Sequence, residues 1–561
     1  MISRRAFLGG AAASLALPFP ALARSPFAQG ASGDKPLETL YNGITLGRPW
    51  PPDWRYPDEH PTRPPYLADR PAVVPIDVGR QLFVDDFLIE ETTMSRTFHK
   101  AAYHPANPIL KPESNWETYD DVSARTNQPF NPAAMVFSDG VFFDPQDRTF
   151  KLFYMAGYGA STSLALSHDG ITWEKPVFDV LKGTNIVHKH PRDSSTVWLD
   201  QFATDPRQRF KMAYWHDHSL MLVVSPDGVH WTEIGETGRS GDRSTFFYNP
   251  FRRVWGFGLR ADQFASMSQS GRYRRYWETA DFTSAVNWAG RSPVAWVKSD
   301  SRDPNRPDGG RPELYNLDCV GYESLMLGLF TIWRGETLLR EKINEVEIGF
   351  SRDGFHWDRP DRSTFLGVSQ QEGDWNWANV QSAGGCCLVV GDELYFYVSG
   401  RQGRPGTADP GVCTTGLARL RRDGFASMDW LPGEGGIIRG RVANSAAGTL
   451  TTRPVTFKGT HLFVNGDFQQ GQLRVEVLDR NGSVIAPFTA GACAPLSGNG
   501  TKLAVNWNGA NLGELAGRTV RFRFTLTKGR LFAFWISAKP TGESGGYPAA
   551  GGPGLSGPID A

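Results

Sequence analysis

Acidic side chains stand beside several strand-like runs of this 561-residue chain. Two carboxyl groups held across one bond can protonate a leaving oxygen and activate a nucleophile or a water molecule. The residues that could supply such a pair are Asp85, Asp86, Asp193, Asp242, Asp318 and Glu323. We expect Asp193 and Asp242 to be the reacting acids and hold the other four in reserve.

Polar and aromatic residues near these acids could hold a substrate. An arginine can bind an acidic or hydroxyl-rich molecule through two hydrogen bonds, and an indole ring suits the C–H face of a sugar. The candidate binding residues are Asn131, Arg192, Arg243, Glu313, Tyr315, Trp375, Trp377, Asn379 and Gln381. Most of the 18 tryptophans are expected to pack between sheets instead.

A repeated phrase predicts the elements that must position these residues. Ser-x-Asp-Gly-x-x-Trp occurs at 167–173, 225–231 and 351–357, and looser copies end at Trp288 and Trp430. Strand-like sequence repeating at this spacing is typical of a β-propeller, so five copies predict five blades around one pocket. The Asp of each phrase is expected to be structural, accepting backbone N–H groups while Gly supplies a positive φ.

The order of the segments predicts an all-β protein: a five-bladed β-propeller over residues 76–432, then a β-sandwich over residues 433–540. Each repeat reads as a strand, an Asp-Pro or Asn-Pro turn and further strands. After residue 433 the phrase is absent, and alternating strands such as 473–478 and 520–526 are typical of a sandwich. The Pro-rich residues 24–75 predict an extended arm, and the Gly/Pro-rich residues 541–561 a disordered tail.

The first 23 residues predict an export signal. Ser3-Arg4-Arg5-Ala6-Phe7-Leu8 resembles a twin-arginine motif, and an apolar stretch and Ala21-Leu22-Ala23 follow it. The stretch is too short for a permanent membrane helix, and no second apolar run of that length exists. We expect a periplasmic or secreted protein without a membrane span in its mature chain.

Composition excludes some functions. Lys and Arg number 59 and Asp and Glu number 59, so no net positive charge favours nucleic acid as a partner. The five cysteines lack the paired spacing of a zinc site. Cys386 or Cys387 could pair with Cys413, or all could be buried thiols. No organic cofactor or metal is expected, and a structural calcium has no support.

The combined pattern resembles the five-bladed glycoside hydrolases of families 32, 43 and 130. Residues 462–479 and 505–509 look like the sandwich that follows family 32 propellers. Asn107-Pro108-Ile109-Leu110 and Phe130-Asn131-Pro132-Ala133-Ala134 are similar to openings of family 130. The resemblance implies cleavage of a glycosidic bond in an oligo- or polysaccharide by carboxyl groups at the starts of innermost strands.

The resemblance also implies roles for single residues. Arg192-Asp193 is similar to the Arg-Asp-Pro that orients sugar hydroxyls in family 32, and Asp242 takes the place of its acid/base residue. Asn131 stands where family 32 carries its Asp nucleophile, and an amide cannot replace a carboxylate there. Asp85 or Asp86 could supply the missing charge.

Two other functions stay open. The loss of an acid at Asn131 favours a non-catalytic glycan-binding propeller. A polysaccharide lyase on the same architecture would need Tyr or His and Arg in the pocket instead of paired acids, and Tyr315 and Arg243 keep that reading open.

Overall fold

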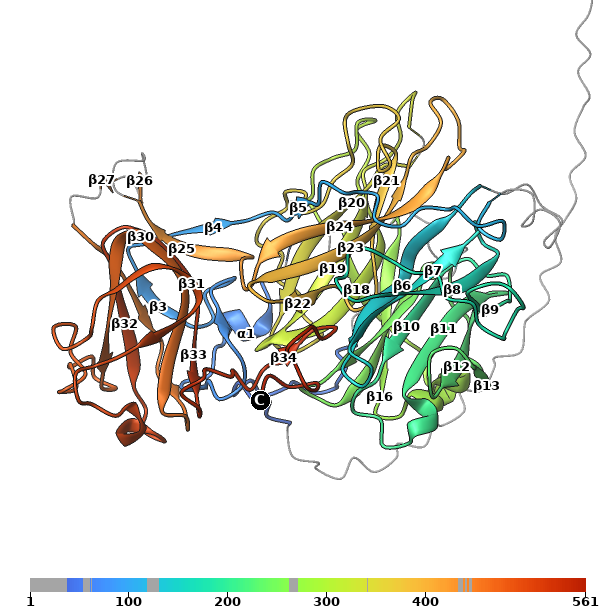
Figure 1. The fold of residues 1–561 in the computed structure, drawn as a ribbon. Coiled ribbons are helices and arrows are strands. Elements are labelled where there is room, and N and C mark those ends of the chain that lie inside the picture. Colours follow the sequence, from blue (N-terminus) through green and yellow to red (C-terminus); the bar gives the residue numbers. More distant parts are fainter. Residues whose placement is uncertain are drawn as a thin grey trace, which may run out of the picture. The chain divides into compact units, whose positions relative to one another are not determined.

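The computed structural model describes residues 38–53, 61, 63–118, 131–261, 271–340, 342–431 and 446–561, with the backbone of 437–438 and 441–442. The predicted export signal, residues 1–23, therefore lies outside the described residues. Nearly all regular structure is β, as the sequence predicts, and the helical pieces are short (Figure 1). No helix in the described ranges is long and apolar enough to cross a membrane.

The first three blades are four-stranded antiparallel sheets formed from consecutive segments of the chain. Blade one consists of β6 (Ala134–Asp144), β7 (Thr149–Ala156), β8 (Ser161–Ser167) and β9 (Ile186–His188). Blade two consists of β10 (Ser195–Leu199), β11 (Phe210–His216), β12 (Ser219–Ser225) and β13 (Thr232–Glu236). Blade three consists of β14 (Thr245–Asn249), β15 (Val254–Arg260), β16 (Tyr273–Thr279) and β17 (Val294–Lys298).

The last two blades borrow strands from distant parts of the chain. Blade four consists of β18 (Glu313–Glu323), β19 (Leu325–Trp333), β20 (Asn344–Ser351) and the C-terminal β34 (Tyr547–Pro548). Blade five consists of β21 (Asn379–Ser382), β22 (Leu388–Val390), β23 (Glu393–Arg401), β24 (Cys413–Arg421) and the N-terminal β5 (Ala102–Tyr103). Pairing of β5 with β24 closes the ring with an early segment.

The innermost strands β6, β10, β14, β18 and β21 neighbour one another around the axis. They are almost wholly buried, because blades pack on both of their faces. Large side chains such as Phe153, Phe246 and Phe330 fill the space between the sheets in one continuous core. This packing fixes the ends of the innermost strands, which carry most of the predicted site residues.

The repeated Asp-Gly phrase forms the expected structural turn. Asp169 Oδ1 accepts the N–H groups of Ile171 and Thr172 at 2.8 and 2.7 Å, and Gly170 has a φ of 73°. The copies at 225–231 and 351–357 repeat these hydrogen bonds. Trp173 packs edge-on against Tyr397 of blade five, so the closing tryptophan contacts a neighbouring blade.

The fifth copy departs from this pattern. The positive φ of 60° falls on Asp423 instead of the following glycine. The buried Asp423 carboxylate forms an ion pair of 2.9 Å with Arg80 and accepts the hydroxyl of Tyr322 at 2.6 Å. This Asp ties a distant segment to the ring instead of closing a local turn.

The C-terminal domain is a β-sandwich that contains more of the chain than the sequence predicts. Its nine-stranded network consists of β2 (Gln81–Leu82), β3 (Ile89–Thr92), β4 (Ser95–Phe98), β25 (Ala426–Trp430), β28 (Gly448–Thr452), β30 (His461–Leu478), β31 (Leu496–Val505), β32 (Arg521–Leu526) and β33 (Gly529–Ser537). Residues 81–98, expected in the propeller, therefore pair with the sandwich, because a strand-like sequence does not reveal its partner. A separate core that includes Phe83, Phe524 and Phe534 holds these strands together.

The two ends of the described chain are packed on the body. Tyr41 of the expected arm stacks on Phe251 with ring centroids 4.3 Å apart, and the arm also contains the short helix α1 (Pro65–Ala68). The structure differs from the expected disordered tail, because β34 pairs with β18 and Ser544 donates a hydrogen bond to the buried Glu323 at 2.7 Å. The Gly-rich residues 541–561 are thus packed against the propeller. All five cysteines are buried and unpaired.

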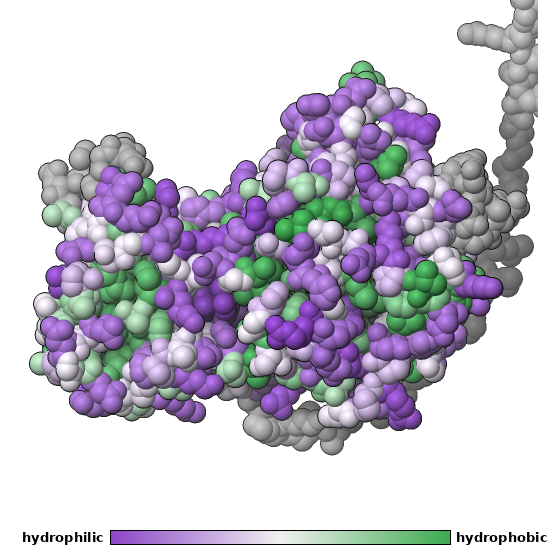
Figure 2. Space-filling view, in the orientation of Figure 1, coloured by the Kyte–Doolittle hydropathy of each residue, from purple (hydrophilic) through white to green (hydrophobic). Residues whose placement is uncertain are grey.

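Figure 2 shows a mostly hydrophilic outer surface that is broken by hydrophobic patches, one of them at the tip of the tallest loops.

Candidate functional site

A cavity of about 800 Å³ lies at the end of the propeller where the innermost strands begin. Its volume is within the range of small-molecule and cofactor sites. Blades one, two, four and five line it within the described part of the chain. Most of the lining comes from segments before innermost strands and from loops between second and third strands. In an antiparallel blade the first strand leads away from this end and the second returns to it, so both kinds of segment meet here.

Aromatic rings form part of the wall. Phe137 belongs to β6, Tyr158 to the loop after β7, Trp215 to β11 and Trp377 to the segment before β21. The Trp215 indole is fixed by donating its N–H to the carbonyl of Ser240 at 3.0 Å. Such rings can stack on the C–H faces of sugars, and the polar side chains around the rings can bind the sugar hydroxyls.

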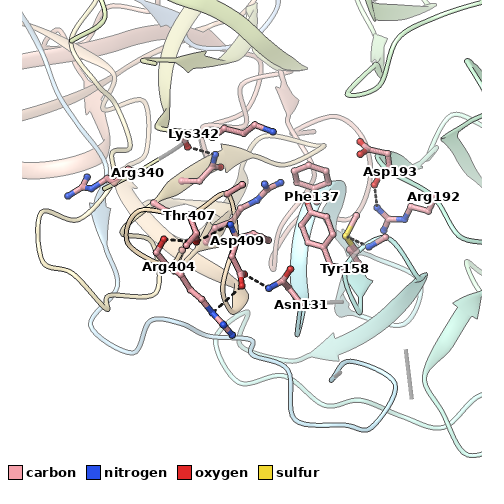
Figure 3. A pocket seen from close by; sticks show the side chains of 18 of the residues that line it. Asn131, Phe137, Tyr158, Arg192, Asp193, Arg340, Lys342, Arg404, Thr407 and Asp409 are labelled. Atoms are coloured by element: carbon pink, nitrogen blue, oxygen red, sulfur yellow. Dashed lines mark hydrogen bonds and ion pairs between the residues drawn. The ribbon is translucent and has the colours of Figure 1, made fainter. Parts of the chain in front are cut away.

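Among the described residues, three with carboxyl groups line the cavity: Asp193, Asp217 and Asp409. Asp193 precedes β10, and its side chain has no ion-pair partner among the described residues. Asp409 lies in the β23–β24 loop, where it accepts the Gly411 N–H at 2.8 Å and pairs with Arg404 at 3.2 Å. Figure 3 shows Asp193 and Asp409 on different sides of the cavity, with Phe137 and Tyr158 between them.

Asn131 lies beside Asp409 and donates its side-chain amide to Asp409 Oδ1 (Figure 3). The position where the resemblance predicts a carboxylate therefore holds an amide that positions a carboxylate from another blade. Asp85 and Asp86 do not take this place. Asp85 is buried in an ion pair of 2.7 Å with Arg352, and Asp86 is an exposed residue of the segment between β2 and β3.

Arg192 lines the cavity and is fixed by a buried acid that the sequence did not single out. Its guanidinium forms an ion pair of 2.7 Å with Asp139 and donates to the Asp193 carbonyl at 3.3 Å. Both side chains of the pair are completely buried. Burial raises the pKa of Asp139, and the neighbouring Arg192 charge opposes that rise. Asp139 lies in the stretch of β6 where the pairing with β7 is interrupted, between Met135 and Gly140.

Asp318 and Gln381 occupy the buried axis and are not part of the cavity wall. Asp318 Oδ2 accepts hydrogen bonds from Ser382 at 2.6 Å, Asn316 at 2.8 Å and Ser138 at 3.2 Å. Burial raises the pKa of Asp318, and the hydroxyl of Ser382 and the charge of Arg243 oppose the rise. Gln381 donates to Asn379, which does line the cavity.

The predicted residues of blades three and four form ion pairs beside the axis. Asp242 pairs with Arg260, as expected if this acid has a structural role, and does not line the cavity. Glu313 pairs with Arg272, and the Arg272 guanidinium lies 5.5 Å from the ring centroid of Tyr315. The structure thus does not bring Asp242 to the wall that holds Asp193.

Glu323 and Trp375 lie away from the cavity wall. Glu323 ends β18, and ten residue steps of about 3.3 Å place it roughly 33 Å from Glu313 at the other end. There the fully buried Glu323 carboxylate pairs with Arg422 at 3.0 Å. Trp375 packs within blade five, edge-on to Tyr103. The sequence alone does not show toward which end of the strand or which face of the blade the side chains of Glu323 and Trp375 point.

Of the predicted site residues, Asn131, Arg192, Asp193, Trp377 and Asn379 therefore meet at the cavity. All belong to segments at or just before innermost strands.

The sequence interpretation missed the residues of the loops between second and third strands. They include Tyr158, Asp217, Arg340, Lys342, Arg404 and Asp409. The alternation of an antiparallel sheet places these loops at the same end, and this signal could have found them.

The described residues contain no cluster of three or more His, Cys, Asp or Glu side chains that could hold a metal ion. The cavity can instead bind a molecule with both apolar faces and polar groups. Its carboxyl groups can exchange protons with that molecule, and its cations can bind anionic groups.

No protein-family profile and no curated protein matches this chain. Among solved structures, a thermostable family 43 glycoside hydrolase is 12% identical, with a TM-score of 0.38 over 54% of this chain and 94% of that chain. A structure described with family 130 mannoside phosphorylases and hydrolases of β-1,2-mannosidic linkages is 14% identical, with a TM-score of 0.34 over 61% and 96%. A β-fructofuranosidase from Schwanniomyces occidentalis is 13% identical, with a TM-score of 0.36 over 78% and 96%. These three structures are described as glycoside hydrolases or together with them, and the chemistry of the present site rests on its own residues.

Proposed function

We propose that this protein is an exported glycoside hydrolase that cleaves a glycosidic bond in an oligo- or polysaccharide bound in the propeller cavity. The observation that carries this proposal is that Asp193 and Asp409 line one cavity together with Trp215 and Trp377. Hydrolysis needs two carboxyl groups across the bond, and the rings offer surfaces for the flanking sugars.

The contacts of the two acids indicate different roles. Asp409 accepts hydrogen bonds from the Gly411 N–H and the Asn131 amide and forms an ion pair with Arg404. A carboxylate fixed in this way suits the base or nucleophile. Asp193 forms no ion pair among the described residues, so its carboxyl group is open to the substrate, and we assign it the contact with the leaving oxygen. The export signal expected in residues 1–23 would carry the enzyme to a periplasm or outside the cell.

The test is a screen of purified protein against a panel of plant and microbial glycans, with Asp193→Asn and Asp409→Asn alongside. Both substitutions should lower kcat by about 10²- to 10⁴-fold, because each removes a proton-transfer or nucleophilic group. Asp86→Asn is the matched control, since Asp86 is an exposed acid outside the cavity. Unchanged sugar release in both cavity variants would overturn the site assignment.

A second candidate, elimination by a lyase, is favoured by one contact. The Arg401 guanidinium lies 5.2 Å from the ring centroid of Tyr158, and both line the cavity. Burial raises the pKa of Tyr158 to about 12, opposed by the nearby charge of Arg401, so its phenol stays protonated at neutral pH. Elimination leaves an unsaturated sugar that absorbs ultraviolet light, whereas hydrolysis adds water and leaves none. Product analysis therefore separates the two reactions.

A further inference from the structure

Among the described residues that line the cavity, cations outnumber carboxyl groups. The lining contains the cationic side chains Arg192, Arg340, Lys342, Arg401 and Arg404 and the three carboxyl groups described above. Arg192 and Arg404 have acidic partners. Within the described ranges, no acidic side chain forms an ion pair with Arg340, Lys342 or Arg401. The described part of the wall therefore presents three cationic side chains that form no ion pair with a described acid, although the Asp193 carboxyl group is an electrostatic neighbour of Arg401.

Arg401 is the most informative of these residues, because it is buried yet unsatisfied. It is 7% exposed, lines the cavity, and its Nε has no hydrogen-bond partner. Its guanidinium donates no side-chain hydrogen bond to any described residue. Buried polar groups are normally hydrogen-bonded, because an unpaired donor loses water without compensation. A ligand that accepts these hydrogen bonds would remove this cost.

Aromatic packing holds the Arg401 guanidinium in one orientation. Its central carbon lies 5.1 Å from the ring centroid of Phe137 and 5.2 Å from that of Tyr158. A guanidinium presents a planar fork that matches a carboxylate or a sulfate through two hydrogen bonds. Stacking restricts the side chain before a ligand arrives, so less conformational entropy is lost on binding.

A second buried arginine lies behind the same wall. The Arg243 guanidinium lies 3.6 Å from the ring centroid of Phe137, and its Nε also has no partner. Its terminal nitrogens donate to the Phe137 carbonyl at 3.3 Å and the Ser138 hydroxyl at 3.2 Å. It has no ion pair with a described acid. Its charge adds to the positive potential around Phe137 and opposes any use of this region for a cationic ligand.

We propose that the cavity binds a glycan whose sugar carries an anionic group, a carboxylate or a sulfate ester, and that Arg401 binds this group. Arg340 and Lys342 then lie at the rim and attract the charged chain. The inference deepens the proposed function, on which it rests for the sugar, and it applies equally to hydrolysis and elimination. Neutral glycans would leave the Arg401 donors unpaired and bind more weakly.

The experiment measures binding by calorimetry to the Asp193→Asn protein, in which turnover is suppressed. The probes are matched pairs: oligogalacturonate with its methyl ester, and a sulfated galactan oligosaccharide with its desulfated form. At least one charged probe should bind about 10- to 100-fold more tightly than its neutral partner. The two pairs distinguish a carboxylate from a sulfate, and the preference should decrease as salt concentration increases.

Substitutions then locate the effect. Arg401→Gln should abolish the preference for the charged probe, and Arg401→Lys should restore only part of it, because an ammonium lacks the fork. Arg340 and Lys342 lie at the rim. If Arg401→Gln fails to fold, Arg340→Gln and Lys342→Gln should still weaken the preference for the charged probe. Equal binding of charged and neutral probes, or no binding of any charged probe, would overturn the inference.

The outcomes also separate this inference from the proposed function. If the wild-type protein binds a charged probe but cleaves no glycan, the anion-binding role of Arg401 is supported and the proposed hydrolase activity is refuted. If the protein cleaves an uncharged glycan and Arg401→Gln does not change the rate, the hydrolase activity is supported and the anion-binding role of Arg401 is refuted.

Discussion

Replacing Asp358 by Asn should make the protein more stable at neutral pH and have little effect in acid. Asp358 follows the tryptophan that closes the repeated phrase at 351–357, and it is partly buried. Burial, together with the negative charge of Asp85, raises its pKa from the ordinary 3.8 to about 6, although nearby arginines oppose the rise. Its ionised form is therefore disfavoured in the folded protein.

The direction of the effect follows from proton linkage. A folded-state pKa above the unfolded value means that the folded protein binds the proton more tightly. The contribution of Asp358 to stability is then fully present below about pH 4 and is lost as the pH rises through about 6. At about 1.36 kcal/mol for each pKa unit, the loss is about 3 kcal/mol. Asn removes the charge with little change in shape.

The assay is urea unfolding followed by tryptophan fluorescence, repeated between about pH 4 and pH 8. The difference between variant and wild type in the free energy of unfolding should be small at the acid end and approach about 3 kcal/mol at neutral pH. Comparing the two proteins cancels the opposite trend from carboxylates with lowered pKa values, such as that of Asp227 at about 2. Asp86→Asn serves as an exposed control. Curves that stay parallel across the whole range would refute the burial argument.

Three further predictions test packing and the cavity. Asp423→Asn should lower the free energy of unfolding by about 3 kcal/mol, because it removes the nearer of the two buried carboxylates that pair with Arg80 and leaves only Glu323 at 3.5 Å, and urea unfolding measures the loss. Ser544→Ala should cost about 2 kcal/mol by removing the hydrogen bond to the buried Glu323, and an unchanged midpoint would show that the tail does not stabilise the propeller. Trp215→Ala should raise KM about five-fold with little change in kcat, whereas Trp215→Phe should keep most of the affinity, as steady-state kinetics on the identified glycan can show.

Features that depend on neighbouring residues could be predicted from the sequence. The Asp-Gly turns form because Asp169 and its counterparts bond to N–H groups two and three residues away. Their repetition predicts the blades, and the direction of each innermost strand predicts the pocket end. For this reason the sequence alone places Asn131, Asp193 and Trp377 in the candidate site, and all three line the cavity.

Features that depend on partners far along the chain could not be predicted. Asp409 is positioned by Asn131, 278 residues earlier, and Glu323 is held by Ser544, 221 residues later. Asp85 pairs with Arg352 across 267 residues, so an acid that seemed available for chemistry is neutralised inside the protein. Sequence spacing carries no record of such pairings.

The sequence by itself therefore determined the repeat, the turns and the end of the ring where the site lies. These features depend on hydrogen bonds and strand alternation between residues that are close in the sequence. Only the tertiary structure decided which acids face the cavity and which form buried ion pairs instead. It also revealed the unpaired Arg401, because burial and the absence of a partner among the described residues are properties of the packed chain.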